Sequence, residues 1–419
     1  MGMKKTEIGM IPEEWDTQSF SDTFRILNNN TYSRTELNYD SGQFRNIHYG
    51  DVLVLFSEVL DCIREDVPYI NDGVRISSSA QPLQDGDVVM ADTAEDETVG
   101  KVTEVINTSD KPVMAGLHTI PFRVKSGKFV PKWLGYYMNS HLYHDQLLPY
   151  IHGTKVSSVS KGSLGDTVII VPKVSEQKRI VDALSDVDAL IANLQKLIRK
   201  KKDIRQGTMQ RVLTGKNRLQ GFSSEWKDTT LGKICDIKDG THQTPHYVEF
   251  GIPFYSVETV TNDDFSHVKY ISLEEHERLT SSYKIENGDV LMTRIGSIGR
   301  GKYVDWNPNA SFYVSLALLK FKGNKPLANF IALLTGTEEF QKEAELHSLQ
   351  FAIPMKINLG QISDIRVRIP TDESEIKAII TVLNDMGCEI KRLEQKLNKY
   401  KQLKQGMMEE LLTGKVRLV

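Results

Sequence analysis

Histidine and carboxylate residues fall into three short patterns that could bind a metal ion. The stretches "HLYH" (141–144) and "HQTPH" (242–246) each hold two histidines, and "PTDESEIK" (370–377) has the Asp…Glu-x-Lys order of a two-acid metal site. A zinc site needs a second pair of ligands at a suitable spacing, and neither histidine pair has one. The acidic run precedes a predicted long helix, whose N-terminus acidic side chains stabilise. We therefore expect no metal site, and interpret His242 and His246 as polar loop residues.

Phosphate-binding and methyl-transfer motifs are incomplete in the sequence. A phosphate-binding loop needs Ser or Thr after its Gly-Lys pair. None of the six such pairs has one; their lysines are Lys101, Lys128, Lys216, Lys233, Lys302 and Lys415. An adenine methyltransferase would carry an Asn/Asp-Pro-Pro-aromatic motif, and the nearest stretches, "DVPY" (66–69) and "NPNA" (307–310), each lack a required residue. The sequence therefore predicts a chain without catalytic activity.

Length and composition indicate a globular protein of two or three domains. The 419 residues exceed the size of one ordinary core, and 40% are hydrophobic and 26% charged. The three cysteines, Cys62, Cys235 and Cys388, are scattered and form no ligand pair. No apolar run is long enough to cross a membrane, and the N-terminus lacks a signal-peptide core. We expect a cytoplasmic protein with free thiols.

A duplicated segment organises the chain. Shifting the sequence by 199 positions aligns 202–219 with 401–418, and ten of these eighteen positions are identical, including the two "LTGK" stretches. Such a match is a strong signal of internal repetition. Upstream at the same offset, Ser175-Glu176 matches Ser374-Glu375.

Both copies carry apolar residues alternately four and three positions apart, which is the heptad spacing of a helix that pairs with another helix. We call these twelve residues the heptad seam: Ile180, Leu184, Val187, Ile191, Leu194, Ile198, Ile379, Leu383, Met386, Ile390, Leu393 and Leu397. Ser175 and Ser374 are candidate N-caps, and each helix is predicted to end at "LTGK". Two separate amphipathic helices remain the alternative, but two matched seams in one chain favour pairing of the two helices with each other.

The remaining sequence has short β-branched runs bounded by Gly, Asp, Asn and Pro, which are typical of strands. These runs are "GDVLVLF" (50–56), "DGDVVMAD" (85–92), "TVIIVP" (167–172), "NGDVLMTR" (287–294) and "IRVRIP" (365–370). We predict an α+β fold: two mixed α/β domains alternating with two long helices, related by a pseudo-two-fold repeat. The predicted limits are 1–172 and 219–370 for the domains and 173–218 and 371–419 for the helices.

The whole chain resembles the DNA specificity (S) subunits of type I restriction-modification systems. The stretches that carry the resemblance are "EIGMIPEEW" (7–15), "GTKVSSVSKGSLGDTVIIVPKVSEQKRIVDAL" (153–184), "DGTHQTPHYVEFGIPFYSVETV" (239–260), "ENGDVLMTRIGSIGR" (286–300) and the two "LTGK" helix ends. The resemblance implies that each domain is a target recognition domain that reads one half of a bipartite, asymmetric site in double-stranded DNA. It also implies that the two long helices form an antiparallel coiled coil that sets the spacer and docks two methyltransferase subunits, with restriction subunits in the full complex. S-adenosylmethionine, ATP and Mg²⁺ would then belong to those partners.

Candidate DNA-contacting residues are polar or basic side chains on predicted loops. In the first domain they are Thr154, Lys155, Ser157 and Ser158; in the second they are Lys238, Thr241, His242, Thr244, Arg294, Ser297, Arg300, Gln350 and Lys356. Arg294 and Arg300 flank the Gly-rich turn "IGSIG", which permits close backbone approach. Any of them could contact phosphate and carry no sequence information.

Positive charge gathers near the C-terminal ends of both helices. From Gln195 to Arg218 nine Lys or Arg residues accompany the single acid Asp203. This run is either a solvated helix face or a surface for phosphate or an acidic partner. Two other functions stay open: a specificity subunit for a fused methyltransferase-nuclease, and an adaptor that binds proteins and no DNA.

Overall fold

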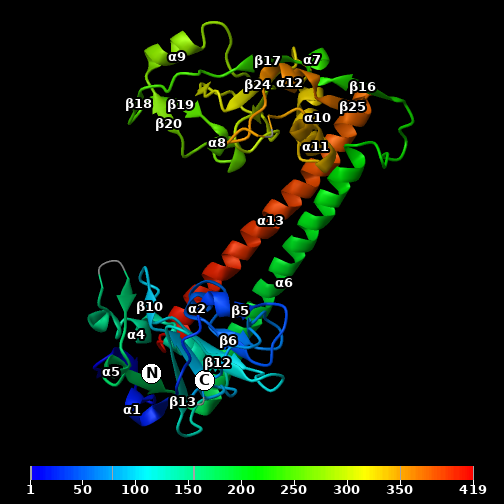
Figure 1. The fold of residues 1–419 in the computed structure, drawn as a ribbon. Helices are drawn as coiled ribbons and strands as arrows, with labels where there is room; N and C mark the ends of the chain where they lie inside the picture. Colours follow the sequence, from blue (N-terminus) through cyan, green and yellow to red (C-terminus); the bar gives the residue numbers. More distant parts are fainter. Residues whose placement is uncertain (1, 78, 154–155, 350, 419) are drawn as a thin grey trace. The chain divides into compact units, whose positions relative to one another are not determined.

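Two helices of 39 residues, α6 (Val174–Val212) and α13 (Glu373–Leu411), each follow a β-rich part of the chain (Figure 1). The structure is a computed structural model, and it describes residues 2–77, 79–153, 156–349 and 351–418. It divides into unit 1, Met1–Leu194 with Lys396–Val419, and unit 2, Gln195–Gln395. Each unit therefore contains one β-rich part and one end of each long helix. The predicted α+β class and the two long helices are confirmed.

The β-rich part of unit 1 is built on a five-stranded sheet, β4-β13-β9-β11-β7, and a four-stranded sheet, β12-β6-β8-β5. Its strands are β1 (Met3–Thr6), β2 (Gly9–Pro12), β3 (Asp16–Ser19), β4 (Phe24–Ile26), β5 (Leu37–Asn38), β6 (Arg45–Ile47), β7 (Val59–Asp61), β8 (Tyr69–Ile70), β9 (Val88–Ala91), β10 (Thr93–Ala94), β11 (Val102–Ile106), β12 (Val113–Ala115), β13 (Thr119–Val124), β14 (Ser157–Ser158) and β15 (Val168–Val171). Its short helices are α1 (Phe20–Thr23), η1 (Arg34–Glu36), α2 (Tyr49–Val54), α3 (Trp133–Met138), α4 (His141–His144), η2 (Leu148–Tyr150) and α5 (Lys161–Leu164).

The β-rich part of unit 2 is built on two four-stranded sheets, β17-β24-β21-β22 and β18-β20-β19-β23. Its strands are β16 (Trp226–Thr230), β17 (Asp236–Asp239), β18 (Tyr247–Val248), β19 (Ile252–Tyr255), β20 (Lys269–Ile271), β21 (Val290–Thr293), β22 (Gly301–Tyr303), β23 (Ser311–Phe312), β24 (Leu316–Lys320) and β25 (Arg366–Pro370). Its helices are α7 (Leu231–Ile234), α8 (Val257–Thr261), α9 (Leu273–Leu279), α10 (Lys325–Leu334), α11 (Glu338–Leu346) and α12 (Leu359–Asp364).

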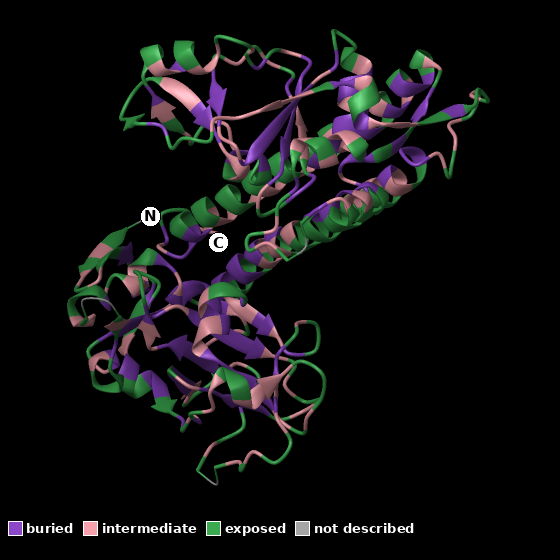
Figure 2. Cartoon of the chain, turned by 45° about the horizontal axis from the view of Figure 1, so that its top comes forward, coloured by how far each residue is buried: buried purple, intermediate pink, exposed green. Residues whose placement is uncertain are grey.

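The strand order of the two parts corresponds. β9 and β21 each lie between two antiparallel strands from later in the chain, β11 and β13 in one part and β22 and β24 in the other. The second sheets also match, because β6 and β12 pair in parallel as β19 and β23 do. The closing strands β15 and β25 pair antiparallel with the entering strands β3 and β16. Figure 2 shows the buried strands at the centre of each part.

Both long helices end in the same way. Gly215 and Gly414 each adopt φ 71°, a left-handed conformation that glycine takes without steric cost. Two residues further on, the N–H groups of Asn217 and Val416 donate at 3.0 Å to carbonyls of the last helical turns. A side chain on Gly414 would collide with Pro12, so the glycine also permits close packing. The shared "LTGK" ending therefore encodes one helix stop, used twice.

The N-terminal cap of α13 differs from the prediction. Asp372, not Ser374, receives the capping bond: the Ser374 N–H donates to Asp372 Oδ1 at 2.8 Å. Hydrogen bonds from Ser374 lower the pKa of Asp372. The Asp-Glu run thus stabilises a helix start, in agreement with its interpretation as a non-metal segment.

The segment 50–56, predicted as a strand, is the helix α2 instead. His48 caps this helix, because its Nδ1 accepts a hydrogen bond from the Gly50 N–H at 3.2 Å. Val52 is buried while Val54 is exposed, so only one face of this helix packs against the protein interior. The apolar pattern was too short to separate a strand from a helix, and the capping histidine decides between them.

None of the twelve heptad-seam residues is exposed; eight are buried and Ile191, Met386, Leu393 and Leu397 are half-buried. In unit 1, Arg179 of α6 donates to the Leu418 carbonyl and Asp188 pairs with Lys404 at 2.7 Å. In unit 2, Lys201 pairs with Glu389 at 2.8 Å, and Arg205 donates to the Leu383 carbonyl. In both units later residues of α6 meet earlier residues of α13, so the helix ends in each unit run antiparallel.

A buried carboxylate on β11 positions α3. Glu104 accepts hydrogen bonds from the Lys132 N–H at 2.5 Å and the Gly135 N–H at 2.9 Å. These are backbone donors that a helix start leaves without intrahelical partners. Burial raises the pKa of Glu104 to about 7, although those N–H groups act in the opposite direction.

Candidate nucleic-acid interface

One tryptophan, one glutamate and one arginine attach each β-rich part to the long helices; we call each set a clamp. In unit 1, Trp15 Nε1 donates to Glu176 Oε2 at 2.9 Å and Arg417 Nη2 donates to the same oxygen at 2.8 Å. The Arg417 guanidinium also lies 5.7 Å from the centroid of the Trp15 ring. Hydrogen bonding to Glu176 raises the pKa of Arg417.

Unit 2 contains the same clamp. Arg218 donates to both oxygens of Glu375, at 2.5 and 2.6 Å, and Trp226 Nε1 donates to Oε2 at 3.2 Å. Glu375 is fully buried, so this charge depends on its partners. Each clamp joins the start of one long helix to the segment after the end of the other. Each clamp thereby fixes the β-rich part of its unit to the helix ends of that unit.

In unit 2, Arg294 follows β21 and connects three segments. Its side chain is only 8% exposed. Nη1 donates to Asp239 Oδ1 at 2.5 Å and Nε donates to the Ile357 carbonyl at 3.2 Å. The other oxygen of Asp239 lies 2.8 Å from His242 Nε2. Arg294 therefore positions the loop after β17, and His242 is the exposed end of this network.

The Gly-rich turn after Arg294 presents Ser297 and Arg300 to solvent. Gly296 and Gly299 adopt positive φ angles of 80° and 74°, which explains why glycine occupies both positions. The Arg300 N–H donates to Thr293 Oγ1 at 2.9 Å, so the backbone of the turn is fixed while the Arg300 side chain is exposed. An exposed side chain on a fixed backbone is suited to contacting a ligand, because its position is already determined before binding.

The other predicted residues of the second domain lie around the same edge. Thr241 bridges to Tyr313, and Lys356 bridges to Ile295. Lys238 lies in β17, with its ammonium 5.9 Å from the centroid of the Tyr283 ring. Thr244 is exposed in the following loop, and Gln350 lies outside the described residues. The structure thus gathers loops from three parts of the sequence at the ends of β17 and β21.

The first domain presents a different surface at the corresponding edge. Ser157 and Ser158 form β14, which pairs with β10. β10 begins directly after Asp92. Asp92 Oδ1 lies 3.5 Å from Nδ1 of His118. Thr154 and Lys155 lie outside the described residues. Asp92 and Arg294 each stand two residues after a buried methionine, Met90 or Met292, so equivalent strands end in side chains of opposite charge.

Several residues at these edges were absent from the sequence prediction. They are Asp92, His118 and Tyr49 in the first domain, and Asp239 and Tyr313 in the second. The rings of Tyr49 and His118 meet edge to face at 5.2 Å. Asp92 could have been found, because it follows "GDVVMA" as Arg294 follows "GDVLMT". Tyr49 and His118 are 69 positions apart in sequence, and a hydrogen bond from the Tyr49 N–H to the Leu117 carbonyl at 3.3 Å joins their segments.

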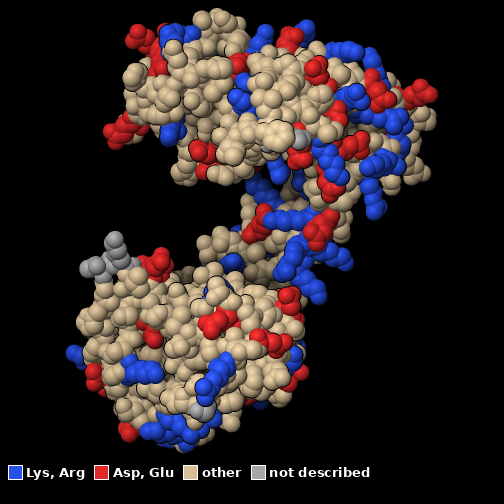
Figure 3. Space-filling model, viewed as in Figure 1, with Lys and Arg blue, Asp and Glu red and all other residues tan. Residues whose placement is uncertain are grey.

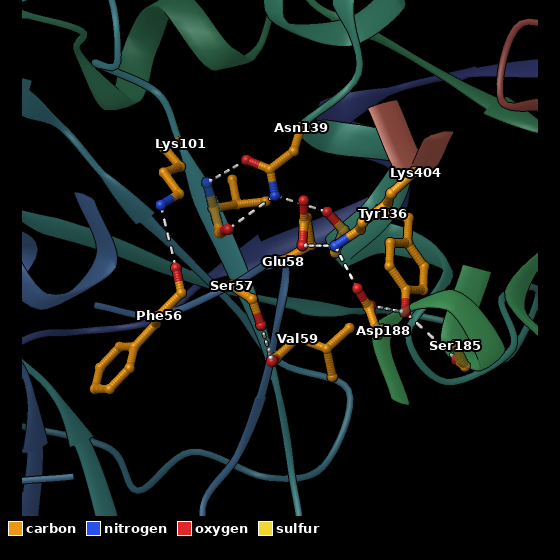
Figure 4. A network of polar contacts seen from close by, with 12 residues as sticks. Phe56, Ser57, Glu58, Val59, Lys101, Tyr136, Asn139, Ser185, Asp188 and Lys404 are labelled. Atoms are coloured by element: carbon orange, nitrogen blue, oxygen red, sulfur yellow. Dashed lines mark hydrogen bonds and ion pairs between the residues drawn. The ribbon is translucent and has the colours of Figure 1, made fainter. Parts of the chain in front are cut away.

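A buried lysine joins α13 to the first domain and α6. Lys404 lies between the carboxylates of Glu58 at 2.5 Å and Asp188 at 2.7 Å (Figure 4). Its ammonium is 5.5 Å from the centroid of the Tyr136 ring, and Tyr136 donates to Asp188 at 2.6 Å. Burial acts to lower the pKa of Lys404, but the two carboxylates outweigh it and leave the pKa raised. The network keeps this lysine charged and fixes the helices to unit 1.

The basic residues of the long helices are partly neutralised within the chain. Lys201 and Lys202 pair with Glu389 and Glu394, and Lys216 pairs with Glu339. Figure 3 shows Lys and Arg interspersed with Asp and Glu along these helices. Lys196, Arg199, Lys200 and Arg211 are exposed. The five basic residues of α13 between positions 391 and 401 are exposed as well, so only the basic surface of α6 is smaller than the sequence alone indicated.

Metal ligands do not gather within the described residues. No three His, Cys, Asp or Glu side chains there are placed to hold an ion. His144, from the "HLYH" pattern, has its Nε2 2.8 Å from the Val99 carbonyl, which is a structural contact. Over the same described ranges, no helix has the length and apolar character needed to cross a membrane.

Comparison with known proteins places these features in a family. The family model described as "Type I restriction modification DNA specificity domain" matches twice, at residues 12–201 and 223–402. A Methanocaldococcus jannaschii protein that carries the name of the MjaX type I restriction enzyme specificity subunit is 23% identical over 444 residues, covering 99% of this chain and 96% of the relative. The StySPI specificity subunit of Salmonella potsdam is 20% identical, covering 79% and 73%.

Solved structures share the fold. A chain of a type I R-M system superposes with a TM-score of 0.61 at 18% identity, covering 97% of this chain and 99% of that one. The S subunit of the M. genitalium type I restriction-modification system superposes with a TM-score of 0.52 at 13% identity, covering 96% of both chains.

Proposed function

The chain belongs to the family of type I restriction modification DNA specificity domains, and from this premise we propose that it is the DNA-reading subunit of a type I restriction-modification enzyme. Each β-rich part acts as a target recognition domain for one half of a bipartite site. The exposed side chains at the two edges differ, with Ser158 and His118 in the first domain and Ser297 and Arg300 in the second, so the two domains present unlike chemistry to DNA. The recognised site is therefore asymmetric.

The candidate residues divide into readers and supports. Ser297, Arg300, His242, Thr244 and Lys356 are exposed donors at one edge of the second domain, within reach of bases or phosphates. Ser158 and His118 have the corresponding position in the first domain. Arg294 supports the second set, because its hydrogen-bonding capacity is directed at Asp239 and Ile357.

The two long helices act as a spacer and a docking surface. We infer that they pair along their lengths as an antiparallel coiled coil, which the burial of the heptad seam supports. The two domains are then held at a fixed separation along the DNA. Leu197 and Ile204 lie seven residues apart and are exposed, so α6 retains apolar surface for partner subunits. Two copies of a methyltransferase subunit suit the pseudo-two-fold arrangement.

The chain itself performs no chemistry in this proposal. S-adenosylmethionine, ATP and Mg²⁺ are bound by the methyltransferase and restriction subunits of a cytoplasmic complex. The observation that carries the proposal is the pairing of two identical clamps with two unlike recognition edges. A protein that reads two different half-sites needs two domains that are attached in the same way but differ in the side chains that they expose.

Methylome sequencing tests the proposal directly. Cells that express this chain with its methyltransferase should carry methylated sites of two short defined blocks separated by unspecified base pairs. The methyltransferase expressed without the chain should leave those sites unmodified. A continuous motif, or methylation that is independent of the chain, would contradict the proposal. A methylated bipartite motif produced by a fused methyltransferase-nuclease would identify a different partner class while retaining the DNA-reading function.

A further inference from the structure

Two large apolar side chains beside the recognition edge of the second domain are completely exposed. Phe351 is 101% exposed and Ile353 is 100% exposed. Single exposed apolar residues are common on protein surfaces and need no explanation. Two such side chains within three residues, next to a polar binding edge, form an apolar tip whose burial would be favourable.

The segment that carries this tip is firmly attached. The Leu349 N–H donates to the Lys356 carbonyl at 2.8 Å, and the Ala352 N–H donates to the Leu349 carbonyl at 3.0 Å. The Gly296 N–H donates to the Met355 carbonyl at 2.8 Å, which joins the segment to the Gly-rich turn. Phe351 and Ile353 therefore stand on a hydrogen-bonded base shared with Ser297 and Arg300.

The first domain has a smaller counterpart at the equivalent place. There Ser158 bridges to His152, just as Lys356 bridges to Leu349, and both segments also pair with the residues that follow the central strand. Val156 lies in this first-domain segment and is 51% exposed. Both domains thus carry an exposed apolar side chain beside their recognition edge, Val156 in the first and Phe351 with Ile353 in the second.

We propose that Phe351 and Ile353 enter the major groove of the half-site read by the second domain and make apolar contacts with its bases. This inference rests on the proposed function, because it needs DNA at that edge. In the major groove the C5-methyl group of thymine is the apolar feature that distinguishes one base from another. The tip therefore selects sequence by a chemistry that Arg300 and Ser297 cannot supply.

DNA suits this tip better than a protein partner does, because of its surroundings. The side chains of Ser297, Arg300 and Lys356 are exposed around it and provide hydrogen-bond donors and positive charge. Donors around an apolar centre match the acceptors and methyl groups of a groove floor flanked by phosphates. A protein interface also has a polar rim around its apolar core, so the positive charge of Arg300 and Lys356 is the feature that favours DNA.

The test uses the full chain assembled with its methyltransferase and a duplex containing the methylated motif. The variant F351A/I353A is compared with two controls. L346A truncates an exposed leucine outside the tip in the same domain, and V156A truncates the exposed valine of the first domain. F351A/I353A should weaken binding to the motif about tenfold, the order of a lost base-pair contact, and leave binding to random duplex unchanged. L346A should match the wild type. Thermal unfolding should be unchanged in F351A/I353A, because its side chains are exposed.

Substituted duplexes locate the contact. Replacing single thymines by uracil removes the methyl group, and the wild type should lose affinity at one half-site only. F351A/I353A should be insensitive to that replacement, and V156A should act on the opposite half-site. If 2-aminopurine fluorescence rises on binding and F351A/I353A abolishes the rise, the side chains separate stacked bases, which also supports base contact.

Three results would overturn the inference. They are binding of the motif by F351A/I353A within about twofold of the wild type, equal losses on motif and random duplex, and failure of this variant to assemble with the methyltransferase. The proposed function fails separately, if no bipartite methylated motif is found at all.

Discussion

Two arginines six positions apart have opposite structural roles. Arg294 is buried and bonded to Asp239, whereas Arg300 is exposed on a turn whose backbone is fixed. The sequence placed both in one candidate set because both flank "IGSIG". Their partners could not be predicted, since Asp239 is 55 residues from Arg294 and only the pairing of β17 and β21 with β24 brings the two together.

Alanine substitutions separate these roles. R294A should lower the stability of the second domain by about 2 kcal/mol, because it leaves Asp239 without its charged partner. R300A should leave thermal unfolding unchanged and weaken DNA binding by the complex. Thermal scans and binding titrations of the two variants provide the comparison. Equal unfolding temperatures for R294A and the wild type would contradict the positioning role.

Glu104 gives the first domain a pH dependence with a defined sign. Its pKa is about 7 in the folded chain, against 4.5 for an unperturbed glutamate. Between these values the folded chain binds a proton that the unfolded chain lacks. The contribution to stability is therefore full below the unfolded pKa and is lost as pH rises through about 7, amounting to about 3 kcal/mol. Between about pH 5 and about pH 8, the free energy of unfolding should fall by more in the wild type than in E104Q. The same change in both proteins would contradict this assignment.

At the scale of elements, the long helices were predictable and the short ones were not. Heptad spacing over many turns and a repeated "LTGK" ending define α6 and α13 from local sequence alone. The strands β9, β15, β21 and β25 were also recognised, because their β-branched runs end at Gly, Asp or Pro. In contrast, 50–56 has the composition of a strand, yet His48 caps it as a helix. The apolar tip was missed because "QFAIPM" has no feature that separates an exposed loop from a buried strand.

Each clamp should be a local determinant of stability. E176Q and E375Q each remove a buried charge on which one arginine depends, so each should cost about 3 kcal/mol. Hydrogen exchange should locate the loss in unit 1 for E176Q and in unit 2 for E375Q. E14Q is the matched control, because Glu14 is exposed and solvent screens its pairs with Lys173 and Arg417. A small effect of E176Q, equal to that of E14Q, would show that the clamp does not hold the domain.

At the scale of the whole molecule, the proposed spacer role can be measured. Four residues inserted after Lys200 in α6 and four after Arg392 in α13 lengthen both helices at facing positions, since Lys201 pairs with Glu389. Each insertion adds roughly 6 Å and slightly more than one helical turn, so the seam can be retained. Methylome sequencing should show both blocks of the motif unchanged and the gap longer by about one or two base pairs. An unchanged gap with full activity would show that the helices do not measure distance.

The first-domain core also has a consequence for synthesis on the ribosome. Met408 and Leu411 of α13, with the following residue Leu412, pack in the same buried cluster as Ile11 and Trp15. The core that begins to emerge first therefore cannot close until almost the entire chain has been translated. Unit 2, which is continuous from Gln195 to Gln395, can complete its core earlier. A nascent chain that stops shortly before residue 408 would thus contain a finished second domain and an unfinished first one, and its exposed apolar surface would lie near the N-terminus.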